Sequence, residues 1–185
     1  MLGLLGFYDE LDNHSGQPNG SIRDAVRPVG EPDEAELVAY LDAGHVLVDV
    51  MESGRDVITG NPHRHSPGCS SLLTDGSWLW RLDFPHYVET HHVSLPDAFV
   101  AHVRGLRHRM PAISVAQFAP HYDETMPLVG WSSAVPWRST ATTLVPEPRE
   151  VISKADFDAA TESQAGDRPS GGWSRPRKPR RLPRA

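Results

Sequence analysis

TDGSWLWRLDFPHYVETHHVSLPDAFVAHV, residues 74–103, decides the fold, because turn, strand and helix signals follow one another in it without conflict. Asp75-Gly76 is a dipeptide typical of a two-residue type I′ turn, so the segments that flank it are predicted to pair as an antiparallel hairpin. In that register Leu73 faces Trp78 across the two strands. Both faces of the hairpin are apolar, which predicts that it lies inside a sheet or under a helix.

Two short helices are predicted after the hairpin. Asp83 can cap the first, whose apolar stripe follows the i, i+3, i+4, i+7 spacing at Phe84, Tyr87, Val88 and His91. Ser94 opens the second, with Pro96 in its first turn and Asp97 in a position like that of a capping box. The inner stripe of this helix is expected at Leu95, Phe99, Val103 and Leu106.

Further elements are predicted on both sides of this stretch. A helix should begin after Pro32, where acidic residues complement the helix dipole, and end near Gly44. Residues 45–51 alternate between apolar and polar side chains and predict a half-buried strand. Residues 56–59 and 112–118 are predicted as two further strands.

The expected fold class is α+β, with a small antiparallel sheet that contains the 71–82 hairpin and packs against about three short helices. Four regions are expected along the chain: an irregular N-terminal segment (1–27), the α+β core domain (28–120), an irregular Pro-rich extension (121–165) and a disordered basic tail (166–185).

Charge is divided unevenly along the chain. Seven of the 18 basic residues and one of the 24 acidic residues lie in 166–185, so this tail carries +6 and residues 1–165 carry −12. An acidic body repels phosphate backbones and suits a cationic partner. Nucleic-acid binding by the folded part is therefore disfavoured.

Cysteine content and hydropathy indicate a cytoplasmic protein. A single cysteine, Cys69, leaves no internal disulfide and no zinc site built from several thiolates, which fits a reducing compartment. The N-terminus has no basic leader, and no apolar run approaches the roughly 18 residues that a membrane span needs.

The loop between residues 60 and 70 carries the first candidate site. His63, His65 and Cys69 offer two imidazoles and a thiol within seven residues, which are suitable ligands for zinc, although no fourth ligand is evident. The alternative is a solvated loop with two surface histidines and a small half-buried cysteine. Cys69 has no surroundings typical of a catalytic nucleophile, and no nucleotide-binding glycine motif is present.

A second cluster is His86, Glu89 and His92 on the first predicted helix. A helix turns by about 100° per residue, which places His86 and Glu89 away from the apolar stripe. We therefore expect a solvated polar face here rather than a metal site.

Aromatic and acidic residues are candidates for binding a protein partner. Trp78 and Trp80 would form a binding platform if exposed, whereas the alternative places both in the core. Asp33, Glu34 and Glu36 form an acidic cluster that could meet a basic partner, although ordinary solvation explains them equally well.

The chain resembles a group of uncharacterised proteins from high-GC actinobacteria. The resemblance covers residues 45–104 and lies in a TDG-x-W-x-W motif, then D-x-x-x-Y-V, then H-V-x-L-P-x-x-F. It implies no activity and transfers no functional residue. Small acidic α+β proteins also occur among immunity proteins that neutralise toxins, which is an analogy of fold alone.

The leading hypothesis is a non-enzymatic cytoplasmic binding protein, immunity-like and without a cofactor, whose acidic surface engages a cationic protein partner. One alternative is a metal-dependent hydrolase or nuclease that uses His63 and His65. Another is an adaptor tethered to nucleic acid or anionic lipid by the basic tail, through Arg175, Arg177, Lys178, Arg180 and Arg181.

Overall fold

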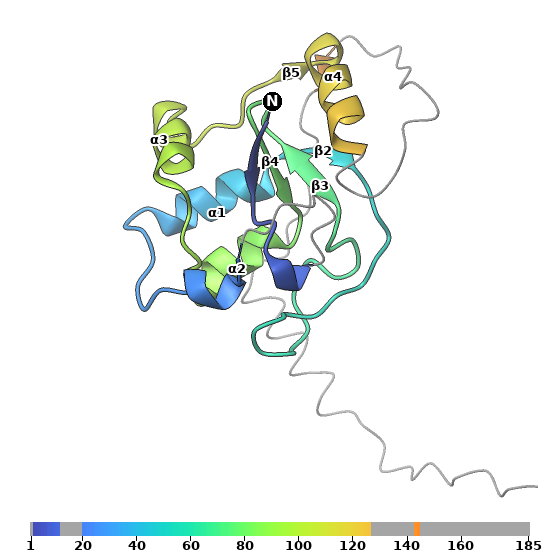
Figure 1. Ribbon diagram of the computed structural model, residues 1–185. Helices are drawn as coiled ribbons and strands as arrows, with labels where there is room; N and C mark the ends of the chain where they lie inside the picture. Colours follow the sequence, from blue (N-terminus) through green and yellow to red (C-terminus); the bar gives the residue numbers. More distant parts are fainter. Residues whose placement is uncertain (1, 12–19, 127–142, 145–185) are drawn as a thin grey trace, which may run out of the picture. The chain divides into compact units, whose positions relative to one another are not determined.

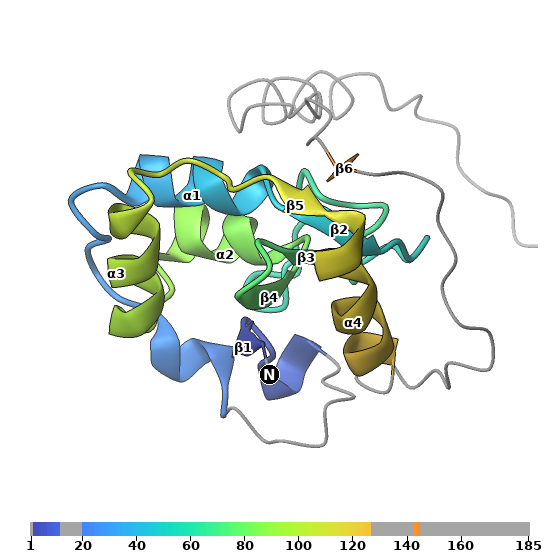
Figure 2. The same cartoon turned by 90° about the horizontal axis from the view of Figure 1, so that it is seen from above.

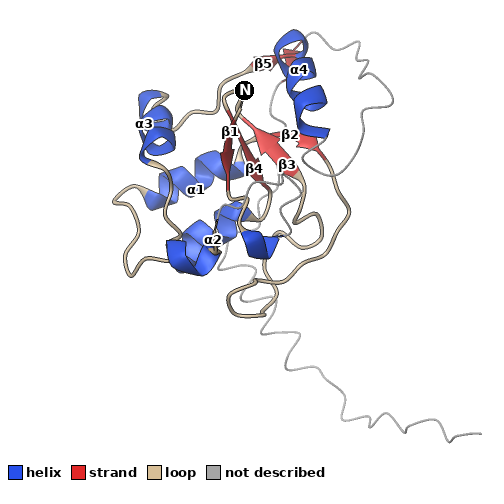
Figure 3. Cartoon of the chain, in the orientation of Figure 1, coloured by secondary structure: helices blue, strands red, loops and turns tan. Residues whose placement is uncertain are grey.

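The computed structural model describes residues 2–11, 20–126 and 143–144. Its four-stranded sheet has the strand order β1-β4-β3-β2, with α1, α2 and α3 on one side and α4 on the other (Figures 1 and 2). The strands of this sheet are β1 (Gly3–Leu5), β2 (His45–Val48), β3 (Leu72–Thr74) and β4 (Trp78–Arg81). The helices are α1 (Glu34–Asp42), α2 (Phe84–His91), α3 (Asp97–Gly105) and α4 (Val115–Thr125). The architecture is α+β, as predicted (Figure 3).

The alternation of side chains on the hairpin builds a core on each face of the sheet. Leu73 and Trp80 pack with α1, α2 and α3, whereas Leu72 and Leu79 pack with apolar residues of α4 on the other face. The Trp80 indole is fully buried and donates its Nε1 hydrogen to the carbonyl oxygen of Leu41 at 3.0 Å. A buried tryptophan therefore keeps its one polar group satisfied.

The helices that the apolar stripes predict are confirmed. In α2 the side chains of Phe84, Tyr87 and Val88 are all fully buried. In α3 Phe99 and Val103 are fully buried as well. This helix begins at Asp97 with Pro96 as its N-cap, two positions later than the predicted start at Ser94.

The turn of the hairpin differs from the prediction by two residues of register. Leu73 pairs with Trp80 rather than Trp78, so the turn centres on Gly76-Ser77. The Asp75 carboxylate accepts the backbone N–H groups of Ser77 and Trp78 at 2.8 and 2.7 Å. This side-chain cap favours the later turn over the type I′ geometry that the Asp-Gly dipeptide predicted. A shift of two leaves each side chain on its predicted face.

The sheet is mixed rather than purely antiparallel, because β1 pairs in parallel with β4. Gly3 lies against the indole of Trp78, where a Cβ would stand 2.5 Å from the ring. Ile22 is fully buried in the same core as Trp80. The segment 1–27, predicted to be irregular and outside the core, thus supplies both a strand and a core residue.

Two predicted strands are wrong in whole or in part. Residues 56–59 form a turn. In 112–118 only β5 (Ile113–Ser114) is extended, and it pairs with β6 (Thr143–Leu144). α4 follows at once because Ser114 and Gln117 form a capping box, which the sequence analysis overlooked.

The helix α4 runs past residue 120, the predicted end of the core domain. Most of the predicted extension and the whole basic tail, with Arg175, Arg177, Lys178, Arg180 and Arg181, lie outside the described residues. Among the helices of the described part, none has the length and hydropathy needed to cross a membrane.

Candidate metal centre

The long connection between β2 and β3, residues 49–71, carries one part of the site. Its two ends are tied together, because the Ser71 hydroxyl donates to Asp49 Oδ1 and accepts the N–H of Val50, both at 3.0 Å. Inside this 49–71 loop, Asp56 Oδ1 accepts the N–H groups of Ile58 and Thr59 at 2.7 and 3.0 Å. The turn therefore fixes the Asp56 carboxylate and leaves its second oxygen, Oδ2, to face α2.

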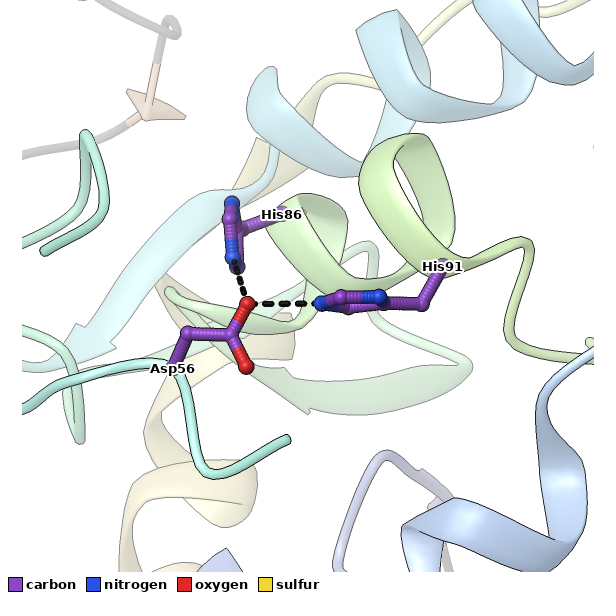
Figure 4. A group of neighbouring side chains, drawn as sticks. All are labelled: Asp56, His86 and His91. Carbon is purple, nitrogen blue, oxygen red and sulfur yellow. Dashed lines mark hydrogen bonds and ion pairs between the residues drawn. The ribbon is translucent and has the colours of Figure 1, made fainter. Parts of the chain in front are cut away.

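The helix α2 brings two imidazoles to this same oxygen (Figure 4). Nε2 of His86 lies 2.9 Å from Asp56 Oδ2, and Nε2 of His91 lies 2.6 Å from it. Residues five apart on a helix project about 140° apart, so the two rings approach Oδ2 from different directions. The side chains of Asp56, His86 and His91 are only 3%, 11% and 12% exposed.

The pKa shifts of Asp56 and His86 favour the protonation states in which these two groups bind a metal ion. Burial alone would raise the pKa of Asp56, but hydrogen bonds from His91, His86 and the amides of Thr59 and Ile58 outweigh it and hold the pKa below its usual range. Burial lowers the pKa of His86 more than its hydrogen bond to Asp56 raises it. A carboxylate and a neutral imidazole are both ready ligands at neutral pH.

Ligand atoms of Asp56, His86 and His91 all lie within 4.8 Å of one another, and no other such group of three occurs in the part of the chain that the structure describes. Two ligand atoms that lie about 2.0–2.1 Å from one tetrahedral ion are about 3.3 Å apart. The two nitrogens now lie 2.9 and 2.6 Å from Asp56 Oδ2, so each distance would have to increase by less than about 1 Å when an ion binds. The Thr90 hydroxyl lies 3.3 Å from His86 Nδ1 and can hold this ring when Nε2 binds a metal.

Next to this trio lies His63, whose ring nitrogens form no hydrogen bond within the described residues. It is 1% exposed. Its ring lies nearly parallel to that of His86, with the centroids 5.0 Å apart. Burial and the neighbouring His86 lower the pKa of His63. Buried polar groups are rarely left unsatisfied, so this imidazole needs an explanation.

The predicted ligand set of His63, His65 and Cys69 does not converge. His65 Nε2 lies 3.4 Å from the carboxylate of Asp42, and Cys69 Sγ lies 3.6 Å from the carbonyl oxygen of Glu52. The alternative of a solvated loop with surface histidines is also wrong, because His63 is buried and the His65 side chain is only 9% exposed. Only His63 of this set lies against the trio.

The prediction that His86 faces solvent is wrong. The helical period places His86 on the side of α2 away from the core, but the 49–71 loop covers that side. Glu89 lies 3.4 Å from Arg64, and His92 lies 2.7 Å from Glu34. The predicted trio of His86, Glu89 and His92 therefore contacts three different partners.

Asp56 and His91 are site residues that the sequence did not predict. His91 was assigned to the apolar stripe of α2 because it lies at i+7 from Phe84. Asp56 was assigned to a strand, although an aspartate followed by amides two and three residues on is typical of a turn. Nothing local in the sequence indicates that this turn meets α2.

The two tryptophans that were candidates for partner binding pack inside the protein to different extents. Trp80 is fully buried, which excludes it from any surface platform. Trp78 is half-buried and contacts Phe99 edge to face, with centroids 5.4 Å apart. Trp80 is therefore a core residue, as the alternative to a binding platform predicted.

The acidic cluster at the start of α1 is largely neutralised within the chain. Asp33 lies 2.5 Å from Arg104 and 2.8 Å from His108. Glu34 pairs with His92, whereas Glu36 is exposed. Asp33 and Glu34 thus already have cationic or imidazole partners.

No protein-family model, curated protein or solved structure matches the chain. The resemblance to actinobacterial proteins therefore stays a prediction.

Proposed function

We propose that this protein binds one divalent transition-metal ion, with Zn²⁺ the best match, through Asp56, His86 and His91. The observation that carries the proposal is the convergence of one carboxylate oxygen and two imidazole nitrogens, largely buried, within 4.8 Å. Zinc accepts mixed nitrogen and oxygen ligands, whereas Ca²⁺ and Mg²⁺ prefer sites made of oxygen alone.

The ion would serve as a cross-link between the 49–71 loop and α2. Asp56 and His86 are 30 residues apart, and one hydrogen bond to Asp56 Oδ2 joins them. Zn²⁺ bound in place of the hydrogen bonds to this oxygen would give the folded state a ligand that the unfolded chain cannot bind as tightly. At a free concentration 100-fold above Kd, such an ion adds about 2.7 kcal/mol to the free energy of unfolding.

The test is metal binding by the 185-residue chain without a purification tag. After treatment with EDTA and removal of the chelator, titration calorimetry with Zn²⁺ should give one equivalent per chain. Asp56→Asn and His91→Gln should each weaken binding at least 10-fold, because each removes one of three ligands. His108→Gln is the matched control, since His108 lies by Asp33 and away from the site. Failure of the unaltered chain to bind Zn²⁺ would end the proposal.

Protein binding has weaker support from the described contacts. It draws on the −12 charge of residues 1–165, but Asp33 and Glu34 are already paired and Trp80 is buried. We also propose a cytoplasmic location, which the single cysteine supports. A contact of the basic tail with polyanions is proposed as well, and the +6 charge of residues 166–185 supports it.

A further inference from the structure

The His63 ring packs against the rings of His86 and Tyr87, but it forms no hydrogen bond within the described part of the chain. Both of its nitrogens are buried, and polar groups of other chain segments surround the ring. Asp83 is engaged by Arg81 in two hydrogen bonds of 2.9 and 2.8 Å, and Asp56 is engaged by α2. The carboxylates of Asp83 and Asp56 therefore already accept hydrogen bonds from other side chains. The ring nitrogens of His63 form none within the described residues.

The distance between the rings of His63 and His86 is close to the distance between two imidazoles bound to one ion. Imidazoles bound to one tetrahedral zinc ion, with Zn–N of about 2.1 Å, have centroids about 5 Å apart. The His63 and His86 centroids are 5.0 Å apart, and those of His86 and His91 are 6.0 Å apart. His63 does not yet share the 4.8 Å spacing of the trio, so its ring has to turn or shift to reach the ion.

Gly54 lies next to both His63 and Cys69. A Cβ on this residue would stand 2.8 Å from Cys69 Sγ and 4.0 Å, an ordinary contact distance, from His63 Nε2. The Cys69 thiol is directed to the carbonyl oxygen of Glu52 instead. Of these two neighbours of Gly54, His63 is the one without a partner.

We infer that His63 supplies the fourth ligand of the metal ion and closes the site. The inference rests on the proposed function, because it needs the ion that Asp56, His86 and His91 hold. Four protein ligands leave no open coordination position for a water molecule, and such closed sites are typical of structural rather than catalytic zinc. The centre is then a structural one, which disfavours a metal-dependent hydrolase or nuclease at this site.

The experiment compares His63→Phe with the unaltered chain. Phenylalanine fills the buried space without a nitrogen, so the metal-free variant should be as stable as the unaltered chain in EDTA, or more stable. Its Zn²⁺ affinity should fall at least 10-fold. With Co²⁺ as the probe, visible absorption should weaken, because the ion gains water where it loses the fourth protein ligand. His65→Phe, the same change in the same loop, should keep both affinity and spectrum.

The outcomes separate this inference from the proposal beneath it. If His63→Phe binds Zn²⁺ as tightly as the unaltered chain with an unchanged Co²⁺ spectrum, the fourth-ligand role is overturned while the metal site stands. Loss of binding in Cys69→Ser would overturn it too, because the thiol would then be the ligand. If Asp56→Asn and His91→Gln bind normally, the metal site itself fails.

A measurement on the unaltered chain covers the case in which His63→Phe does not fold. Zn²⁺ is added to ¹⁵N-labelled protein, and the imidazole nitrogen shifts are recorded. Three histidines, His63, His86 and His91, should each show one nitrogen shifted to the metal-bound range. A response from His86 and His91 alone would contradict the role of His63.

Discussion

Tyr40→Phe tests how the turn of the hairpin is held to the helices. The Asp75 side chain is fully buried, and its Oδ2 lies 2.6 Å from the Tyr40 hydroxyl and 2.9 Å from Nε2 of His102. Its Oδ1 accepts the N–H groups of Ser77 and Trp78. Burial, together with Asp75, raises the pKa of Tyr40, so its hydroxyl stays protonated and donates.

The magnitude follows from the burial of both partners. A hydrogen bond to a charged group contributes ~1.5–3 kcal/mol when its loss leaves that group underpaired. At about 2–4 °C per kcal/mol for a chain of this size, Tyr40→Phe should lower Tm by roughly 3–12 °C. His102→Ala removes a donor to the same oxygen, but the His102 side chain is 28% exposed, so its loss should cost only ~0.2–1 kcal/mol.

The assay is urea unfolding of the three proteins, followed by far-UV circular dichroism, with thermal melting as a second measurement. The free energy of unfolding should fall more for Tyr40→Phe than for His102→Ala. A loss below about 0.5 kcal/mol for Tyr40→Phe, or an equal loss for both variants, would show that burial does not strengthen this contact as argued.

Three further predictions concern the turn, the thiol and the imidazoles. Gly76→Ala should lower the free energy of unfolding by about 1 kcal/mol or more, because Gly76 has a φ of +87° and a Cβ would stand 3.3 Å from Ile113; unchanged urea unfolding would contradict this. Burial raises the pKa of the Cys69 thiol, so a disulfide reagent should label it far more slowly in native buffer than in denaturant, and equal rates would count against its burial. In EDTA, the free energy of unfolding should fall as the pH drops below about 6.5. The pKa values of His63 and His86 are lowered in the folded chain, so the unfolded chain takes up protons at a higher pH than the folded chain does. Urea midpoints that do not decrease between about pH 7.5 and 5.5 would contradict this prediction.

The sequence predicted those elements whose signals are local. The stripes of α2 and α3 repeat every three or four residues, and the faces of the hairpin alternate, so each buried side could be assigned without tertiary information. The register of the hairpin could not be predicted in this way. The Asp75 carboxylate accepts the N–H groups of Ser77 and Trp78, and these hydrogen bonds favour a later turn than the Asp-Gly dipeptide alone predicts.

The candidate site was out of reach for a different reason. Asp56 and His91 are 35 residues apart, and their contact depends on the path of the 49–71 loop across α2. The helical period assigned His91 to the core and His86 to solvent, and the loop covers both. The sequence did indicate His63 as a metal ligand, but with His65 and Cys69 as its companions rather than the residues of α2.

The most direct test of the metal centre is zinc-edge X-ray absorption of the 185-residue chain loaded with one equivalent of Zn²⁺. We expect only nitrogen and oxygen ligands at about 2.0–2.2 Å, with the multiple scattering of imidazole rings. A sulfur ligand at about 2.3 Å would place the ion on Cys69 instead, and a shell of oxygen alone would show that Asp56, His86 and His91 do not hold it.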